Sequence, residues 1–87
     1  MARWSQVSGD ARWMRANVRS YPSFDGDEEP QSCDVGSVQL DVMEILDRWS
    51  QANHRYFKVK LQNRSFCVLR CDNGTQEWEM TAPTTHR

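Results

Sequence analysis

Apolar and polar residues alternate in short runs through the second half of the chain, and residues that favour turns separate these runs. Arg55 to Leu61 and Ser65 to Cys71 are two such runs, and the Gln62-Asn63-Arg64 segment between them has the length of a hairpin loop. Alternation with a period of two is typical of strands that bury one face. The pattern therefore predicts an antiparallel β meander in which consecutive strands pair.

The loop lengths of the hairpins determine which residues lie opposite each other. A three-residue loop at Gln62-Asn63-Arg64 places Phe57 opposite Leu69. The Asn73-Gly74 pair predicts a two-residue type I′ turn, which places Leu69 opposite Trp78. Both registers put the same apolar side chains on one face. The predicted inner face comprises Phe57, Val59, Leu61, Cys67, Leu69, Trp78 and Met80, and Val38, Leu40 and Ile45 supply a facing wall.

Residues 38–49 fit two patterns. Val38, Leu40 and Val42 alternate as in a strand, but from Leu40 onward an apolar residue also recurs at every third position, as on one face of a helix. The alternation resumes in shifted phase at Met43, as a β-bulge near Val42 would produce in a long bent strand. We expect the strand and keep the helix as the alternative.

The chain has 87 residues, which is enough for one small domain. We predict a mainly β domain over residues 31–81, in which about five antiparallel strands form an SH3-like barrel or a strongly bent sheet. Residues 1–30 mix apolar and polar positions without a steady period, so we expect a weakly structured arm and an acidic loop there. We expect residues 82–87 to form a frayed tail.

The formal net charge of −1 conceals three blocks of different sign. Residues 1–19 carry four arginines and one aspartate, and residues 20–47 carry eight acidic residues and no Lys or Arg. Residues 48–87 carry seven basic and three acidic residues. One interpretation is that the blocks neutralise each other in the folded chain, and the other is a basic surface that binds nucleic acid.

The three cysteines are an odd number and cannot all pair within the chain, so we expect reduced thiols. Cys33, Cys67, Cys71 and His54 could together supply four zinc ligands. However, Cys67 and Cys71 lie four positions apart on one predicted strand, unlike the ligand pair of a Cys-x-x-Cys knuckle. We therefore expect no metal site and no cofactor.

The sequence contains no Gly-x-Ser-x-Gly segment, no phosphate-binding glycine loop and no His-Glu-x-x-His motif. Glu44 and Asp47 could serve as an acid and base pair only in a cleft, and acidic side chains on an exposed strand are normally solvated. We expect no enzymatic activity and assign no catalytic residue. Because no apolar run is long enough for a membrane span or a signal peptide, we expect a cytoplasmic protein without membrane association.

The hairpin of residues 55–71 has a predicted outer face rich in cations and rings. The side chains on this face are Tyr56, Lys58, Lys60, Phe66, Val68 and Arg70. Rings between cations can stack on bases and neutralise phosphates, and exposed aromatic residues also anchor protein partners. Alternatively, the arm of residues 1–30 covers this face. We expect a non-catalytic interaction module with a protein partner, keep nucleic acid as the alternative ligand, and make no prediction of the oligomeric state. The expected binding residues are Tyr56, Lys58, Lys60, Phe66 and Arg70.

Several segments together resemble the pattern of a family of short uncharacterised bacterial proteins. They are Val42-Met43-Glu44-Ile45-Leu46-Asp47-Arg48-Trp49, His54-Arg55-Tyr56-Phe57-Lys58-Val59, Leu69-Arg70-Cys71-Asp72 and Glu77-Trp78-Glu79-Met80-Thr81. The resemblance covers residues 18–81 and implies a domain boundary and a bacterial cytoplasmic setting, but no reaction. Arg64 departs from the family pattern because a glycine would fit the turn better, and Cys67 and Cys71 replace an aromatic residue and a histidine.

Overall fold

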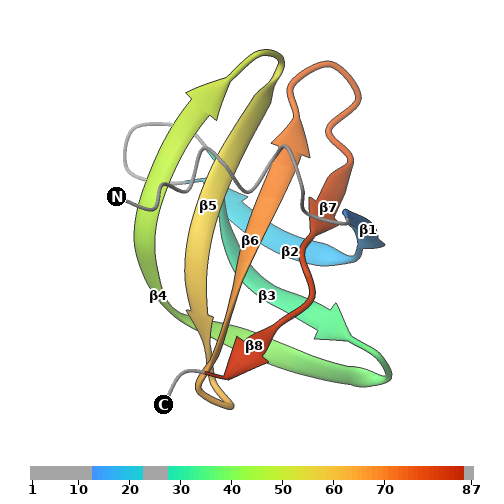
Figure 1. Cartoon of the computed structure of the whole chain (residues 1–87). Helices are drawn as coiled ribbons and strands as arrows, with labels where there is room; N and C mark the ends of the chain where they lie inside the picture. Colours follow the sequence, from blue (N-terminus) through green and yellow to red (C-terminus); the bar gives the residue numbers. More distant parts are fainter. Residues whose placement is uncertain (1–12, 23–27, 86–87) are drawn as a thin grey trace.

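Short alternating runs form strands along most of the described chain (Figure 1). The structure is a computed structural model and describes residues 13–22 and 28–85. The strands are β1 (Met14–Ala16), β2 (Val18–Pro22), β3 (Glu28–Val35), β4 (Val38–Gln51), β5 (His54–Leu61), β6 (Ser65–Asp72), β7 (Trp78–Met80) and β8 (Thr84–Thr85). They form an antiparallel sheet that curls into a half-barrel, without a helix in the described residues. The predicted fold class is confirmed.

The strand order across the sheet is β1-β7-β6-β5-β4-β3-β2, and β8 pairs with β6. The strands β3 to β7 therefore follow one another in space as they do in sequence, which confirms the predicted five-strand meander. Asn17 alone separates β1 from β2, so one stretch of chain pairs with β7 at one edge and with β3 at the other. The Asn17 carbonyl accepts a hydrogen bond from the Asp34 N–H at 3.0 Å.

The structure corrects the expectation of a weakly structured arm and a frayed tail in three places. Residues 14–22, which the sequence placed in a weakly structured arm, form β1 and β2. Thr84–Thr85, placed in the tail, forms β8 against Ser65 and Phe66. Each of these strands is at most five residues long, so its stability comes from the neighbouring strand rather than from a pattern within its own sequence. Glu28–Pro30, which the sequence placed at the end of the acidic loop, are the first residues of β3, and residues 1–12 and 23–27 lie outside the described ranges.

The β5–β6 hairpin has the predicted register. Phe57 lies opposite Leu69 and Val59 opposite Cys67. Arg64, the last residue of the three-residue loop, has φ +71°, and its N–H donates to the Leu61 carbonyl at 2.8 Å. This left-handed backbone is the conformation that the third position of such a loop requires, although glycine adopts it more readily than arginine.

The β6–β7 hairpin differs from the prediction by two residues, because Leu69 lies opposite Met80 rather than Trp78. The predicted two-residue type I′ turn is wrong. The Asp72 carboxylate oxygen Oδ1 accepts hydrogen bonds from the N–H groups of Gly74 at 2.7 Å and Thr75 at 3.0 Å, which stabilises a longer loop. A shift of two residues leaves every side chain on its predicted face, so Trp78 and Met80 remain in the core.

The ambiguous segment of residues 38–49 lies within one long strand, β4, and the helical alternative is wrong. The register against β5 shifts between Val42 and Glu44 and again between Ile45 and Asp47. The predicted bulge near Val42 is therefore confirmed, and a second bulge follows it. Each bulge bends the strand, which allows β4 to pair first with β3 and then with β5.

The concave side of the half-barrel holds the hydrophobic core. All seven residues of the predicted inner face are buried, together with Cys33, Leu40 and Cys71. Burial of a side chain the size of Leu or Val contributes about 1.5 to 3 kcal/mol, so this layer is the main stabilising feature of the fold. Ile45 packs against the core, but Val38 is 54% exposed and does not belong to the facing wall. Val38 flanks the Gly36-Ser37 turn, where the chain has already left the core.

Candidate functional site

The structure brings the five expected binding residues together on the outer face of β5 and β6. Tyr56 lies opposite Arg70, and Lys60 lies opposite Phe66. Lys58 lies between these two cross-strand pairs. Because directly opposite residues of an antiparallel pair project to the same side, all five side chains share the convex face. We call these five residues, with Val68, the outer hairpin face.

Much of the outer hairpin face is occupied by contacts within the fold. Tyr56 is only 4% exposed, and its ring stacks on Trp49 with ring centroids 5.2 Å apart. Trp13 meets the Tyr56 ring edge-on at 6.0 Å. The Arg70 guanidinium lies 4.1 Å from the centre of the Trp13 ring and bonds Glu79 at 2.6 Å. The aromatic and cationic groups at this end are therefore part of the packing.

Trp13 belongs to the segment that the sequence placed in the arm, so in its described part that arm covers the Tyr56 end of the face. The indole Nε1 atoms of Trp13 and Trp49 are both buried and have no hydrogen-bond partner. An unpaired buried donor is unfavourable, so these two rings are held by packing and not by polar contacts.

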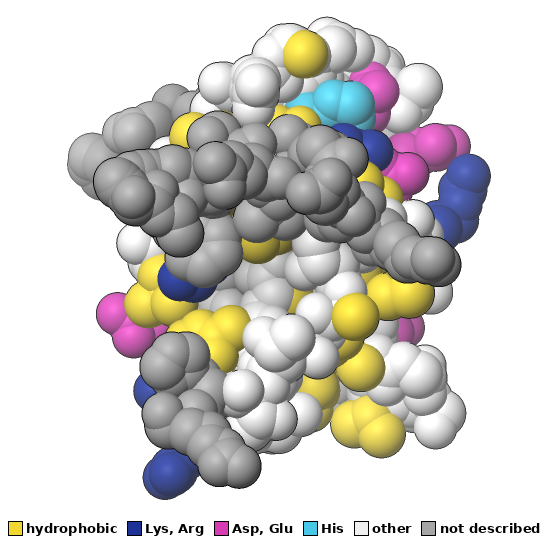
Figure 2. All heavy atoms as spheres, viewed as in Figure 1, with side chains coloured by type: hydrophobic (Ala, Val, Ile, Leu, Met, Phe, Trp, Pro, Cys, Tyr) yellow, Lys and Arg dark blue, Asp and Glu magenta, His cyan; other side chains and the backbone are white. Residues whose placement is uncertain are grey.

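Acidic residues of β3 and β4 face basic residues of the neighbouring strands. Asp47 lies opposite Lys58, and Glu44 lies opposite Lys60. Arg48 bonds Glu29, and Arg19 bonds Asp34 at 3.3 Å. Where the described side chains are visible in Figure 2, Lys and Arg side chains are scattered and do not form one patch. The basic and acidic blocks of the sequence therefore meet at several points of the fold.

A groove opens between β3 and β4 because the two strands diverge. β4 pairs with β3 only over Val38–Asp41 and then pairs with β5 from Val42 onward. β3 continues to pair with β2 as far as Glu28. The gap between the two strands holds a hollow of about 400 Å³. Its lining residues are Tyr21, Glu29, Pro30, Gln31, Val42, Met43, Glu44, Ile45 and Arg48.

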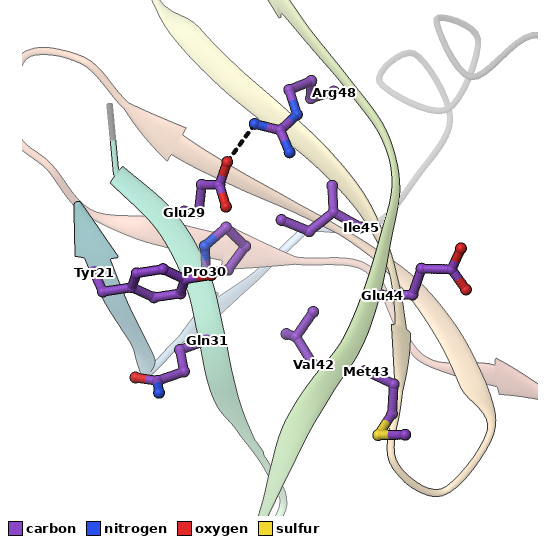
Figure 3. A pocket seen from close by; sticks show the side chains of 9 residues that line it. All are labelled: Tyr21, Glu29, Pro30, Gln31, Val42, Met43, Glu44, Ile45 and Arg48. Atoms are coloured by element: carbon purple, nitrogen blue, oxygen red, sulfur yellow. Dashed lines mark hydrogen bonds and ion pairs between the residues drawn. The ribbon is translucent and has the colours of Figure 1, made fainter. Parts of the chain in front are cut away.

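The groove has an apolar floor and a mixed rim (Figure 3). Val42 and Ile45 project from β4 towards buried Pro30 on β3, whereas Glu44 points away from the gap. Tyr21 and Met43, at the rim, are 44% and 65% exposed. Arg48 bridges the gap to Glu29 through an ion pair. A second hollow of about 250 Å³ shares Arg48 and continues along β4 to Ser50.

A polar cluster ties the tips of two hairpins together. Asn53 donates to the Asp72 carboxylate at 3.2 Å, and the Asn73 N–H donates to the Asn53 carbonyl at 2.8 Å. Backbone hydrogen bonds from Thr75 and Gly74 hold the pKa of the Asp72 carboxyl below its usual value. These hydrogen bonds fix the two turns relative to each other, which gives the cluster a structural role.

The three thiols are buried and free of disulfides. A hydrogen bond with Cys33 and burial both raise the pKa of Cys67. Burial raises the pKa of Cys71, against a hydrogen bond from Arg55 that lowers it. A thiol with a raised pKa is a poor nucleophile at neutral pH. In the described ranges, His, Cys, Asp and Glu form no group of three or more that could hold a metal ion.

Sequence reasoning located the outer hairpin face but missed the groove. Two signals for it were present: the phase shift at Met43, which marks the first bulge, and Pro30, which has no N–H for strand pairing. Neither signal reveals that β3 and β4 separate beyond Asp41, because the separation is a property of the folded sheet and not of either strand alone.

Within the described ranges, the structure has no helical segment with the length and hydrophobicity that crossing a bilayer requires. No family model, curated protein or solved structure matches this chain. The resemblance to short bacterial proteins therefore stays a prediction, and the fold and the groove carry the argument about function.

Proposed function

We propose that this domain is a non-catalytic interaction module that binds a polypeptide segment of a protein partner in the β3–β4 groove. The observation that carries the proposal is the divergence of β3 and β4, which leaves between the two strands a groove with Val42 and Ile45 at its floor and a mainly polar exposed lining. Small barrels of the SH3-like kind bind extended peptides in surface grooves lined by aromatic residues, and we propose the same type of barrel and binding here. Tyr21 at the rim supports this comparison.

The groove has more support as the site than the outer hairpin face. Tyr56 and Arg70 already contact Trp13, so a partner at that end would have to displace it. The nucleic-acid alternative relies on the same face and loses two of its five groups in the same way. In the groove, Tyr21 and Met43 are exposed, and the described contact that spans the gap is the Arg48–Glu29 ion pair.

A selection experiment tests the proposal. Phage displaying random peptides are selected against the immobilised domain, and enriched peptides are measured against three variants. Tyr21→Ser and Met43→Ser remove rim contacts, and Val38→Ser is the control because Val38 is 54% exposed but does not line the groove. Removal of an interface anchor should weaken binding about tenfold or more, with little change for the control. Equal binding to all three variants would contradict the groove as the site.

A further inference from the structure

We propose that the occupant of the groove is an extended, positively charged segment of a partner protein that adds as a strand along the free edge of β4. This inference rests on the proposed function and specifies the chemistry of the ligand. Three features of the groove carry it: a strand edge without a partner, an apolar floor, and the charge of the strands that form its walls.

The edge of β4 that faces β3 is unpaired beyond Asp41. From Val42 to Gln51, β4 pairs with β5 on one side, and within residues 13–22 and 28–85 no strand pairs with its other side. The Arg48 N–H instead donates to the Asp47 carboxylate at 2.9 Å. Unpaired N–H and C=O groups along a strand edge bind an extended peptide by strand addition.

The unpaired edge extends from Val42 to Ser50, with the larger hollow beside its first part and the second hollow, which β4 shares with Arg55–Phe57 of β5, near its end. At ~3.3 Å per residue this is roughly 25 Å of strand, which is enough for a segment of about seven residues. The bulges near Met43 and Leu46 interrupt regular pairing, so the regular part of the edge is Asp47–Gln51. At the bulged part, alternate side chains of the segment would instead contact Val42 and Ile45 on the floor.

The charge of the strands around the groove indicates a basic ligand. The charged residues that line the two hollows are Glu28, Glu29 and Glu44 against Arg48 and Arg55. Residues 18–22 and 28–51 as a whole contain six acidic residues against two arginines. Residues 54–85 contain five basic against three acidic residues. A basic segment is attracted to the acidic side, and a Lys or Arg of the segment could also compete with Arg48 for Glu29.

The same charge disfavours a second copy of this chain as the occupant. Pairing two β4 edges would bring two acidic sides together, and juxtaposed like charges weaken association. The Tyr21 ring at the rim adds a surface on which the aliphatic stem and charge of a Lys or Arg side chain can pack. A basic segment with apolar residues at alternate positions can therefore hydrogen-bond to the free edge of β4, contact the floor of the groove and pack on Tyr21 at the rim.

Four synthetic peptides of eight residues test the inference against the full chain labelled with ¹⁵N. The first alternates Lys and Val, the second Glu and Val, and the third Ser and Val. The fourth is the Lys-Val peptide with alternate backbone nitrogens methylated, so that it keeps its charge and loses strand hydrogen bonds. Each is titrated at about 50 mM and about 300 mM NaCl while amide chemical shifts are followed.

We expect the Lys-Val peptide to shift amides of Glu28–Gln31 and Val42–Gln51, with affinity at least tenfold above the Glu-Val peptide and weaker at higher salt. Methylation should abolish the shifts. Glu28→Gln with Glu29→Gln should weaken binding several-fold, whereas Glu77→Gln, in the β6–β7 turn, should not. Thermal melts of both variants establish whether a lost response reflects unfolding.

The outcomes separate the inference from the proposed function. Equal binding of the Lys-Val and Ser-Val peptides at the groove would overturn the charge requirement and leave the groove as the site. Unchanged binding after methylation would overturn strand addition. Shifts on the outer hairpin face alone, or no peptide binding, would overturn both proposals, as would a stable dimer whose interface is β4.

Discussion

The β5–β6 hairpin and the β3–β4 hairpin both join consecutive antiparallel strands, but only β5–β6 stays paired along its length. In β5–β6 the pairs run without interruption from His54 opposite Asp72 to Lys60 opposite Phe66. In β3–β4 the pairs end at Ser32 opposite Asp41, and beyond that point β4 bulges twice and, among the described strands, pairs only with β5 on its opposite edge. The continuous hairpin carries the core, and the divergent one produces the groove.

The difference shows that the alternation of apolar residues determines which face of a strand is buried. It determines only weakly which other strand that strand pairs with. The inner residues of β5 and β6 are all apolar from Phe57 to Leu61 and from Cys67 to Cys71, so every cross-strand pair adds burial. On β4, two bulges place Met43 and Leu46 outside the alternation, where both are exposed. Pairs between β3 and β4 beyond Asp41 would therefore bury fewer apolar side chains than the pairs of β5–β6 do.

The largest expected effect is on the free energy of unfolding, and it compares a core residue of β5–β6 with a residue in the floor of the β3–β4 groove. Phe57 is 5% exposed and lies 5.8 Å from the Trp78 ring, so Phe57→Ala should lower the free energy of unfolding by about 3 to 5 kcal/mol. Ile45→Ala, in the groove floor, should cause a smaller loss because that side chain is only partly buried. Denaturant titration measures both losses. Equal losses would mean that the groove side is packed as fully as the core.

The next effect concerns the cover of the outer hairpin face. Trp13→Ala removes the contacts with Tyr56 and Arg70 and should lower the free energy of unfolding by about 2 kcal/mol. Trp13→Phe keeps a ring in place and removes the unpartnered indole N–H, so it should retain most of that stability. Thermal unfolding compares the two variants. An unchanged melting temperature in Trp13→Ala would show that Trp13 does not cover this face in solution.

The turns of the two hairpins should respond in opposite directions. Arg64 and Gly36 both have positive φ, +71° in the β5–β6 loop and +63° in the β3–β4 loop. Arg64→Gly should raise the free energy of unfolding by about 0.5 to 1 kcal/mol, and Gly36→Ala should lower it by about 1 kcal/mol. A Cβ on Gly36 meets no atom within 4 Å, so the loss reports backbone strain alone. Destabilisation by Arg64→Gly would contradict the loop geometry.

The smallest expected effect is on the pH dependence of stability, through the Asp72 carboxylate at the β6–β7 turn. Because the pKa of Asp72 is lowered in the folded chain, its contribution to stability is present above its unfolded pKa and is lost as the pH falls through the folded pKa. Asp72→Asn should therefore reduce the loss of stability between neutral pH and about pH 3. Urea titrations at the two pH values measure this. An identical acid-induced loss in both proteins would exclude a role for this carboxylate.

The sequence was sufficient to predict the register of strands where the alternation of apolar residues and the loop length agree. The three-residue loop and the alternation give the same β5–β6 register, and the resulting core residues are buried. The β6–β7 register was wrong because Asp72 competes as a side-chain acceptor for the N–H groups of Gly74 and Thr75. Propensity rules for Asn-Gly turns do not include that competitor.

The candidate site was less predictable than the fold. The five residues of the expected site do share a face, but the cover by Trp13 depends on a segment without any periodic pattern. The groove depends on the separation of β4 from β3 beyond Asp41, and its rim residue Tyr21 comes from a strand that the sequence did not predict. Both features come from contacts between segments far apart in the chain, which local patterns do not encode.

Amide hydrogen exchange of the isolated monomer, followed by NMR, tests most directly whether the β4 edge is open. In the bulge-free stretch Asp47–Gln51, amides bonded to β5 should exchange slowly and the intervening ones faster by about a hundredfold. In Arg55–Val59 of β5, which has a strand on each side, all amides should exchange slowly. Slow exchange at every amide of Asp47–Gln51 would mean that the edge is already paired and would contradict the groove as an open site.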